Sequence, residues 1–262
     1  MNSRQSSAAL RPINGIVMGN AMHVVVPAAG AGSRLGLPYP KEIHRIVEGM
    51  SLIDFSLRHV LADPHLFEAL TVVIVPGKEA VVRYARAAAP AGVAVNSAVF
   101  NDSYTEWAGS ILSAEAHFRP RNVVLLPDSR LTVDGSATLA RRYTAAFDQG
   151  CDVVFAYLPT GDPSALTRLG ALRVDGDSVV EFCDKPAPEQ ASRFNGFWGS
   201  FGFVSEAGPA LLHLMMDSIA RHPVDLGSLG LRVGAFPIDA YEDLGTWPAI
   251  RDFQRRASGT HQ

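Results

Sequence analysis

The sequence has 262 residues with a formal net charge of −3, and 47% of the residues are hydrophobic while 19% are charged. This length and apolar content suffice for one large α/β domain with a full core. The balance of charges offers no basic surface for nucleic acid, and no apolar run approaches the roughly 18 residues of a membrane span. We therefore expect neither a nucleic-acid partner nor a membrane partner.

The cysteines and the termini add little chemistry. Cys151 and Cys183 lack metal-ligand spacing, so we interpret them as reduced thiols of a cytoplasmic protein. Residues 1–21 are small, polar and aperiodic and lack the apolar core of a signal peptide, which predicts a flexible leader. A single domain is expected over 22–256, followed by a tail over 257–262.

The first apolar run, Val24–Val26, predicts a buried strand that ends at Pro27. It leads into residues 28–34, Ala-Ala-Gly-Ala-Gly-Ser-Arg, which we call the glycine loop. Small residues let a backbone bend and approach a ligand, and consecutive N–H groups can form an anion-binding concavity. Arg34 brings a planar charged fork suited to phosphate oxygens, and Lys41 places a second cation just after Pro40.

Two common phosphate-binding patterns do not fit the glycine loop. A dinucleotide fingerprint needs G-x-G-x-x-G, but Gly36 comes one residue too late after Gly30 and Gly32. A P-loop needs a lysine after its last glycine, and Leu37 stands there instead. The residues match a third pattern, G-x-G-S-R followed by P-K. The alternative is an ordinary strand-to-helix turn with a surface arginine.

The next segments alternate between helix and strand. Hydrophobic spacing predicts a helix over 51–61 with Ser51 as its N-cap, a strand over 71–75, a helix over 78–89 and a strand over 93–97. This β-α-β-α-β order predicts a parallel sheet with right-handed crossovers. Ligands of such sheets bind at the carboxyl ends of the strands, where the glycine loop lies.

Lysine is rare, because only Lys41, Lys78 and Lys185 occur among 23 basic residues. A retained lysine favours a position that needs a compact ammonium. Lys41 and Lys185 lie in Pro-Lys and Lys-Pro pairs, whereas Lys78 is expected only to begin a surface helix.

Two polar positions follow in the middle of the chain. Gly109 and Ser110 are expected to begin a helix over 111–117, where N–H groups and a hydroxyl can meet a base or a phosphate; an ordinary helix cap packed over Trp107 is the alternative. Asp128 follows a buried strand over 122–126, a position typical of a Mg²⁺ ligand. No D-x-D pattern of a metal-dependent glycosyltransferase accompanies it.

The remaining elements are predicted from the same patterns: a helix over 137–149, a strand over 152–157, a hairpin over 169–174 and 179–183, a strand over 197–204, a helix over 206–219, a strand over 233–237 and a last helix ending near 256. Asp184-Lys185-Pro186 follows the hairpin directly. Asp243-Leu244-Gly245-Thr246 precedes the last helix.

Five motifs in this order resemble those of the sugar-1-phosphate nucleotidyltransferases. They are the glycine loop with Pro40-Lys41, the Gly109-Ser110 segment, Pro127-Asp128, Asp184-Lys185-Pro186 with the strand around Gly199, and Asp243-Leu244-Gly245-Thr246. The resemblance covers about residues 22–253. It departs at Pro127, where the family has glycine, and at Asp184, where it has glutamate.

The resemblance implies a fold and an activity. The fold is α/β, a Rossmann-like three-layer arrangement around a mixed, mostly parallel sheet of the nucleotide-diphospho-sugar transferase or GT-A type, with a small β-hairpin sugar-binding subdomain. The activity is condensation of a nucleoside triphosphate with a sugar 1-phosphate to give an NDP-sugar and pyrophosphate. With no hexapeptide repeat in the sequence, we expect no acyltransferase fusion.

The resemblance also implies roles for individual residues. It assigns catalysis to Arg34, Lys41 and Lys185, and the binding of a Mg²⁺ ion to Asp128 and Asp243. It assigns sugar binding to Gly170, Asp184 and Gly199. The residues that it assigns to nucleotide binding are Ala28, Ala29, Gly30, Ala31, Gly32, Ser33, Gly109 and Ser110.

Two alternatives stay open. The segment over 101–114 is also similar to that of cytidylyltransferases that use a non-sugar acceptor such as phosphocholine or a phosphonate. A non-catalytic homologue that binds a nucleotide sugar in a regulatory role is the other. The base, the acceptor and any homo-oligomerisation are open at this point.

Overall fold

The computed structural model describes residues 21–133, 135, 137–218 and 222–259. The expected leader, apart from Ala21, and the last three residues of the expected tail therefore lie outside the described residues. The first element begins at Met22 and the last ends at Gly259.

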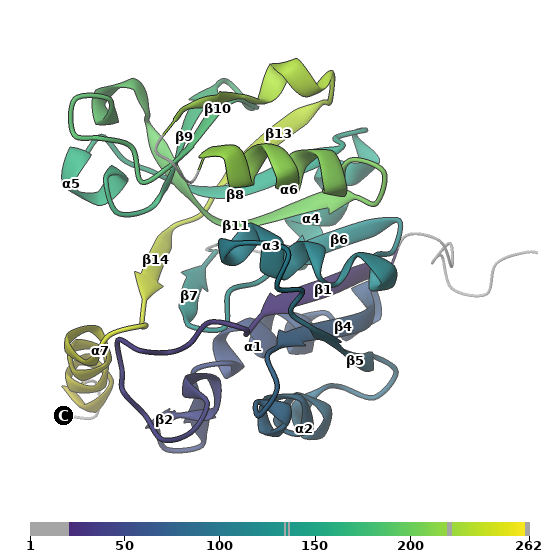
Figure 1. Ribbon diagram of the computed structural model, residues 1–262, viewed down its shortest axis with the longest axis vertical. Helices are drawn as coiled ribbons and strands as arrows, with labels where there is room; N and C mark the ends of the chain where they lie inside the picture. The colour runs from purple at the N-terminus through teal and green to yellow at the C-terminus, as the bar shows by residue number, and fades with distance from the viewer. Residues whose placement is uncertain (1–20, 134, 136, 219–221, 260–262) are drawn as a thin grey trace, which may run out of the picture.

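A mixed sheet of ten strands forms the middle of the described structure (Figure 1). Its strands are β1 (Met22–Pro27), β4 (Phe67–Ile74), β5 (Ala94–Val99), β6 (Arg121–Val124), β8 (Val153–Pro159), β9 (Gly170–Asp175), β10 (Ser178–Asp184), β11 (Gly196–Val204), β12 (Val224–Asp225) and β13 (Val233–Pro237). The spatial order is β12-β10-β13-β8-β11-β6-β1-β4-β5, and β9 pairs with β10 and β11.

The N-terminal half of this sheet is parallel, as the alternation of elements predicts. β1 pairs in parallel with β4 on one side and β6 on the other, and β4 pairs in parallel with β5. The apolar runs of β1, β4 and β6 are buried on both faces of the sheet, which is typical of strands covered by helices on both sides, whereas the edge strand β5 is buried only at Ala98. The antiparallel strand β11 joins this half to β8 and β13.

Helices cover both faces of the sheet and complete three layers (Figure 1). On one face lie α1 (Asp54–Ala62), α2 (Glu79–Ala88) and α4 (Leu139–Asp148), and on the other lie α3 (Glu106–Leu112) and α6 (Gly208–Asp217). Neighbouring residues of β1 divide between the two cores: Val24 and Val26 pack with the first set of helices and Val25 with the second. The predicted three-layer α/β fold around a mixed sheet is thus confirmed. The expectation of a mostly parallel sheet is wrong, because the hairpin strands and β11 add antiparallel pairs that outnumber the parallel ones.

The predicted hairpin is formed by β9 and β10, with Gly176 in its turn at φ +57°. A small core of its own lies beside it and includes Leu166, Cys183 and Phe194. The hairpin is also continuous with the large sheet, because β9 pairs with β11 and β10 pairs with β13. Burial raises the pKa of the Cys183 thiol to about 11, so this cysteine stays protonated.

Five short strands were not expected from the sequence: β12, at the edge of the large sheet, and two pairs outside it. β2 (Arg45–Val47) pairs with β3 (Met50–Ser51), and β7 (Ser129–Thr132) pairs with β14 (Ala240–Asp243). Beyond them, the last helix α7 (Trp247–Gly259) packs on a separate core around Leu35, Ile46 and Phe55. In Figure 1, β14 lies beside β7 and leads into α7.

Two predicted helix starts are wrong. α1 begins at Asp54 rather than after Ser51, because Ser51 still belongs to strand β3 and pairs with Arg45. α3 begins at Glu106, five residues before the predicted Ile111. Gly109 and Ser110 therefore lie inside this helix and not at its N-terminus.

A buried histidine joins three neighbouring strands of the parallel half. His23 of β1 is fully buried and hydrogen-bonds Thr71 of β4 at 2.8 Å and Asn122 of β6 at 2.9 Å. Burial lowers the pKa of His23 to about 4, from an ordinary value of 6.5. The folded protein therefore holds this imidazole uncharged.

We expect the free energy of unfolding to fall as the pH falls from about 6.5 to about 4. The unfolded chain protonates His23 in this window and the folded chain does not, so each pH unit costs up to about 1.4 kcal/mol, with no further loss from this group below pH 4. Urea unfolding at several pH values measures this slope. The His23→Gln variant should show a shallower slope, and an identical slope would contradict the assignment.

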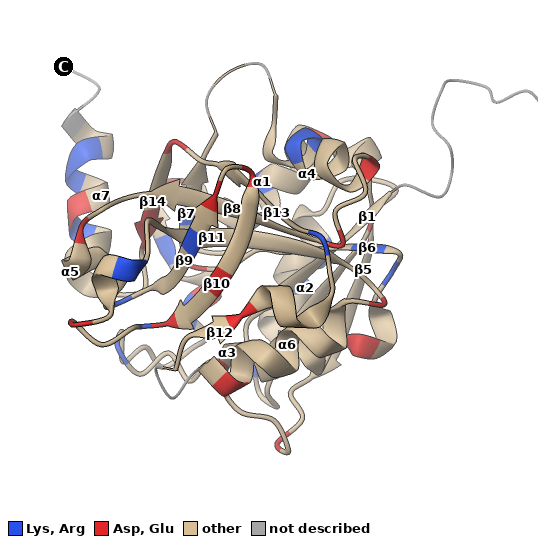
Figure 2. Cartoon of the chain, turned by 90° about the horizontal axis from the view of Figure 1, so that it is seen from above, with Lys and Arg blue, Asp and Glu red and all other residues tan. Residues whose placement is uncertain are grey.

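Charged residues of both signs are mixed along the described surface, as on α7 (Figure 2). Among the described residues, no helix combines the length and the apolar character needed to cross a lipid bilayer.

Candidate active site

The glycine loop leaves the end of β1 with its backbone N–H groups free. The Ala28 N–H is bound to Val73 O of β4 at 2.8 Å, which anchors the start of the loop. The next six N–H groups form no hydrogen bond with any described residue; they belong to Ala29, Gly30, Ala31, Gly32, Ser33 and Arg34. Such a run of free donors is suited to an anion.

Lys41 lies against this loop. Its side-chain carbons come within 3.6–3.7 Å of the position that a Cβ on Gly32 would take, and Gly32 has φ +67°. The Lys41 ammonium donates to Asp128 Oδ2 at 2.5 Å, and both side chains are largely buried. A predicted phosphate-binding cation and a predicted metal ligand are therefore in direct contact.

Arg34 reaches the second predicted metal ligand. Its guanidinium donates to Asp243 Oδ2 at 3.5 Å, and the Gly245 N–H donates to the other oxygen of the same carboxylate at 2.8 Å. A Cβ on Gly245 would lie 2.7 Å from Arg34 Nη2 and 2.9 Å from Asp243 Oδ1. Glycine at this position therefore permits the arginine and the carboxylate to meet.

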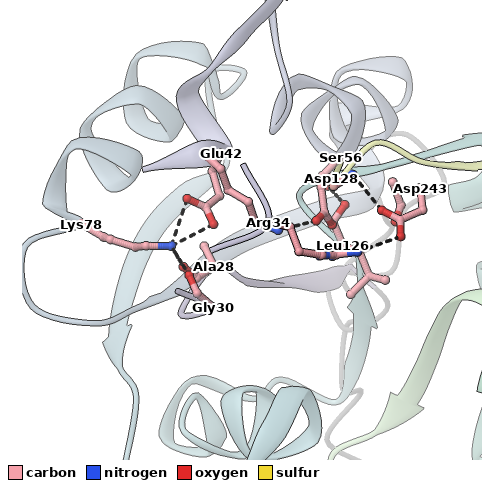
Figure 3. Close-up of polar contacts among 12 residues, drawn as sticks. Ala28, Gly30, Arg34, Glu42, Ser56, Lys78, Leu126, Asp128 and Asp243 are labelled. Atoms are coloured by element: carbon pink, nitrogen blue, oxygen red, sulfur yellow. Dashed lines mark hydrogen bonds and ion pairs between the residues drawn. The ribbon is translucent and has the colours of Figure 1, made fainter. Parts of the chain in front are cut away.

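The unexpected pair of strands β7 and β14 brings the two aspartates together. Asp243 stands opposite Ser129, the residue after Asp128, and the Leu244 N–H donates to Asp128 O at 2.8 Å. Figure 3 shows both carboxylates with Arg34 between their segments. Farther along, the Trp247 indole of α7 donates to Leu35 O at 3.0 Å, so the last helix holds the segment that follows the glycine loop.

A cavity of about 640 Å³ opens beside these groups. Its lining combines parts of the glycine loop, the cations Arg34 and Lys41, four carboxylates and an apolar wall; the residues are Pro27, Ala29, Gly30, Arg34, Lys41, Glu42, Val75, Phe100, Asp102, Glu106, Trp107, Ser110, Leu126, Pro127 and Asp128. The volume falls within the range of ligand pockets in proteins.

The Gly109-Ser110 segment contributes differently from what was predicted. The Gly109 N–H is bound to Thr105 O inside α3, so it is not free for a ligand. A Cβ on Gly109 would lie 2.5 Å from Tyr104 Cβ, which makes glycine a packing requirement here. Ser110 does line the cavity, and its buried hydroxyl has no hydrogen-bond partner among the described residues.

The residues predicted for the sugar side lie outside the cavity lining. Asp184 is buried, its backbone N–H bonds Ser218 Oγ at 2.7 Å, and its carboxylate pairs with Lys185 at 2.9 Å. Lys185 has a half-exposed side chain and φ +52°, an unusual value for a residue other than glycine. Gly199 is enclosed by packing, since a Cβ there would lie 2.5 Å from Leu131.

Gly170 is held close to Trp198, and this gives a prediction. A Cβ on Gly170 would lie 1.9 Å from Trp198 Nε1, and the indole is itself buried. We expect Gly170→Ala to lower the free energy of unfolding by about 1–3 kcal/mol, as overpacking does. Urea unfolding measures the loss. Gly161→Ala is the matched control, because nothing lies within 4 Å of its Cβ position and stability should stay unchanged or rise by up to about 1 kcal/mol.

Lys78 contradicts the expectation of a surface lysine. It is 9% exposed, and its ammonium donates to Ala28 O at 2.8 Å, to Gly30 O at 2.6 Å and to the Glu42 carboxylate at 2.9 Å (Figure 3). Sequence reasoning missed Glu42 altogether. The scarcity of lysine and the glutamate directly after Lys41 were the signals that could have found this pair.

The donor set fits a magnesium ion. Among the described residues no group of three or more His, Cys, Asp or Glu side chains could hold a metal. Asp128 and Asp243 offer hard carboxylate oxygens on adjoining segments, and both now accept hydrogen bonds from cations. Mg²⁺ is usually bound by one or two carboxylates together with substrate phosphates and water, which is the set that this cavity can supply.

The sequence alone identifies no relative, because comparison with protein-family models and with curated proteins gives no match. The fold does. Solved structures with the same arrangement are nucleotidyltransferases, so the predicted fold class is confirmed.

Three of them show the extent of the likeness. A UDP-glucose pyrophosphorylase complexed with UDP-glucose has a TM-score of 0.74 and 16% sequence identity, covering 92% of this chain and 100% of its own. The UDP-glucose pyrophosphorylase of Acinetobacter baumannii has a TM-score of 0.72 and 17% sequence identity, covering 92% of this chain and 94% of its own. The inositol-1-phosphate CTP transferase of T. maritima has a TM-score of 0.65 and 15% sequence identity, covering 92% of this chain and 96% of its own. At these identities the likeness is one of fold.

Proposed function

We propose that this chain is a nucleotidyltransferase that condenses a nucleoside triphosphate with a sugar 1-phosphate and releases pyrophosphate. One observation carries the proposal: a loop with six consecutive free backbone N–H groups brings Ala29, Gly30 and Arg34 to the same cavity as Lys41 and Asp128, and Arg34 pairs with Asp243. Donors and cations gathered in this way suit a polyphosphate. Solved structures with this fold include UDP-glucose pyrophosphorylases, one of them complexed with UDP-glucose and another bound to UTP.

The chemistry needs positioning more than a reactive side chain. An oxygen of the acceptor phosphate forms a bond to the α-phosphorus, the bond from that phosphorus to the bridging oxygen breaks, and pyrophosphate leaves with the electron pair. The free N–H groups and Arg34 would hold the β- and γ-phosphates, while Lys41 would lie at the α-phosphate. A Mg²⁺ ion on Asp128 and Asp243 would supply charge neutralisation and orientation for the phosphates.

Fewer observations support the residues proposed to bind the acceptor. Lys185 would hold the acceptor phosphate, and Asp184, Gly170 and Gly199 the sugar. Gly170 and Gly199 are enclosed by packing, which favours a role in shaping the acceptor site rather than direct contact with the acceptor. Ser110 would meet the base through its unpartnered hydroxyl.

A non-sugar acceptor is the second candidate. None of the four residues predicted for the acceptor side lines the cavity, and one structure with this fold is an inositol-1-phosphate CTP transferase. The experiment below therefore also tests a cytidylyltransferase activity with an acceptor other than a sugar. The non-catalytic alternative is less favoured, because Arg34, Lys41, Asp128 and Asp243 are all present and form two ion pairs on adjoining segments.

Pyrophosphate release tests these candidates together. Five nucleoside triphosphates are combined with sugar 1-phosphates, inositol 1-phosphate, phosphocholine and phosphonates in the presence of Mg²⁺. A pair that releases pyrophosphate at rates of the order of 1–10³ per second identifies the substrates. No release with any pair, from protein that binds nucleotide, would favour the non-catalytic homologue and contradict the proposal.

A further inference from the structure

Lys78 uses all three of its donors within one buried cluster. One N–H points to Ala28 O, one to Gly30 O and one to the Glu42 carboxylate, at 2.6–2.9 Å. Glu42 is 1% exposed, so the pair is shielded from water. A buried charge with complete hydrogen bonding is held in one geometry, because every other arrangement would leave a donor or an acceptor unsatisfied.

The two carbonyls that Lys78 binds determine where the neighbouring amides point. In a trans peptide the C=O and the N–H of the same unit point in opposite directions, and no cis peptide occurs among the described residues. Because Ala28 O and Gly30 O face Lys78, the N–H groups of Ala29 and Ala31 face away from it. These are two of the six free donors of the glycine loop.

Glu42 connects this cluster to the second phosphate-binding element. It follows Lys41 directly in a short 3-10 helix, Lys41–Ile43, and its own backbone carbonyl accepts the Ile53 N–H at 2.9 Å. The Lys78–Glu42 pair therefore links the glycine loop, the segment that carries Lys41 and the start of α2. Figure 3 shows Lys78 on one side of Ala28 and Gly30, and Arg34 on the other side.

We propose that Lys78 is a positioning residue of the nucleotide site: it binds the carbonyls of the glycine loop so that the Ala29 and Ala31 amides face the polyphosphate, and Glu42 holds it there. The inference rests on the proposed function for the identity of the anion. Lys78 touches no substrate in this arrangement, because its ammonium is enclosed by its three partners. Its effect on turnover passes through the loop.

A buried ion pair can also serve stability alone, and the variants must separate the two roles. Removing one partner of such a pair strands the other charge, whereas replacing both by apolar residues of similar volume is often neutral for folding. The double variant Lys78→Met/Glu42→Met is therefore the main test. Asp63→Asn is the control, because Asp63 is also buried and paired, with Arg141 at 3.2 Å and with Thr138, but belongs to no part of the site.

The probe is inorganic pyrophosphate, titrated into each full-length protein by calorimetry with Mg²⁺ present. We expect the double variant to keep its melting temperature within a few degrees and to bind pyrophosphate at least 10-fold more weakly. The KM for the nucleoside triphosphate should rise by a similar factor, while the KM for the acceptor stays within about 2-fold. Asp63→Asn should lower the melting temperature and leave the pyrophosphate affinity unchanged.

A second measurement does not depend on any variant folding. In ¹H–¹⁵N spectra of the wild-type protein, pyrophosphate should shift the amide signals of Ala29 and Ala31 strongly. Unshifted signals from both, or unchanged pyrophosphate affinity in a folded double variant, would overturn the inference. So would a wild-type protein that binds no pyrophosphate.

The outcomes also separate this inference from the proposed function. If no substrate pair gives turnover, yet pyrophosphate binds, shifts these amides and binds more weakly to the double variant, the positioning role stands and the transferase activity falls. If turnover is found and the double variant turns over like the wild type with the same KM for the nucleotide, the activity stands and the positioning role falls.

Discussion

Asp128→Asn and Asp243→Asn should each lower kcat by about 10³-fold, equivalent to roughly 4 kcal/mol of transition-state stabilisation. The Leu244–Asp128 backbone bond and the β7–β14 pair place the two aspartates on adjoining segments, where both would hold the same proposed Mg²⁺ ion. Asparagine keeps the size of the side chain and removes the charge. In Asp128→Asn, Lys41 also loses the carboxylate that it now contacts at 2.5 Å.

Steady-state assay of pyrophosphate release measures this loss, and unfolding curves show whether the fold is kept. Asp175→Asn serves as the matched control, because Asp175 is exposed in the turn between β9 and β10. A chelator should abolish the activity of the wild-type protein, and added Mg²⁺ should restore it. Full activity in an excess of chelator would refute the metal assignment.

Lys41→Arg should lower kcat/KM by about 10²-fold, or roughly 2.7 kcal/mol, although the charge is kept. The ammonium lies between the glycine loop and Asp128, and its stem packs along Gly32. A planar guanidinium is larger and cannot act as a point charge in that space. The loss should be the same for every acceptor that the enzyme uses.

Lys185→Arg is the informative comparison for Lys41→Arg. Lys185 is half-exposed and pairs with Asp184, outside the lining of the cavity. We expect its substitution to raise the KM for the acceptor more than the KM for the nucleotide. Kinetics with each substrate varied in turn resolve the two patterns. Equal behaviour of the two variants would mean that the phosphate roles assigned to these lysines are wrong.

The sequence was sufficient where the signal is local. The apolar runs of β1, β4 and β13 are continuous and end at prolines or turns, so hydrophobic pattern alone locates them. The glycine loop was found for the same reason, since small residues directly after a buried strand have few other uses. Alternation of strand and helix then predicted the parallel order, because crossover connections have one hand.

The sequence was insufficient where a contact spans the chain. Arg130 of β7 pairs with Glu242 of β14 across 112 residues. Both strands are short and polar, so they show no hydrophobic periodicity from which they could be predicted. Lys78 was misjudged because its burial is decided by Ala28 and Gly30, about fifty residues earlier. A helix start with a charged residue looks solvent-exposed unless the loop that covers it is known.

The separation of partners along the chain has a consequence for the timing of assembly during synthesis. Arg34 meets Asp243 across 209 residues, and Leu35 is held by Trp247 of α7. At a translation rate of about 5–20 residues per second, roughly 10–40 s pass between the synthesis of Arg34 and that of its partner. During this interval a nascent chain already carries the glycine loop, Lys41 and Lys78, but it lacks the second carboxylate and the helix that holds the loop segment. If the chain binds a magnesium nucleotide as proposed, tight binding therefore requires the C-terminal segment. A ribosome-bound intermediate would then fold its N-terminal half before it binds the ligand.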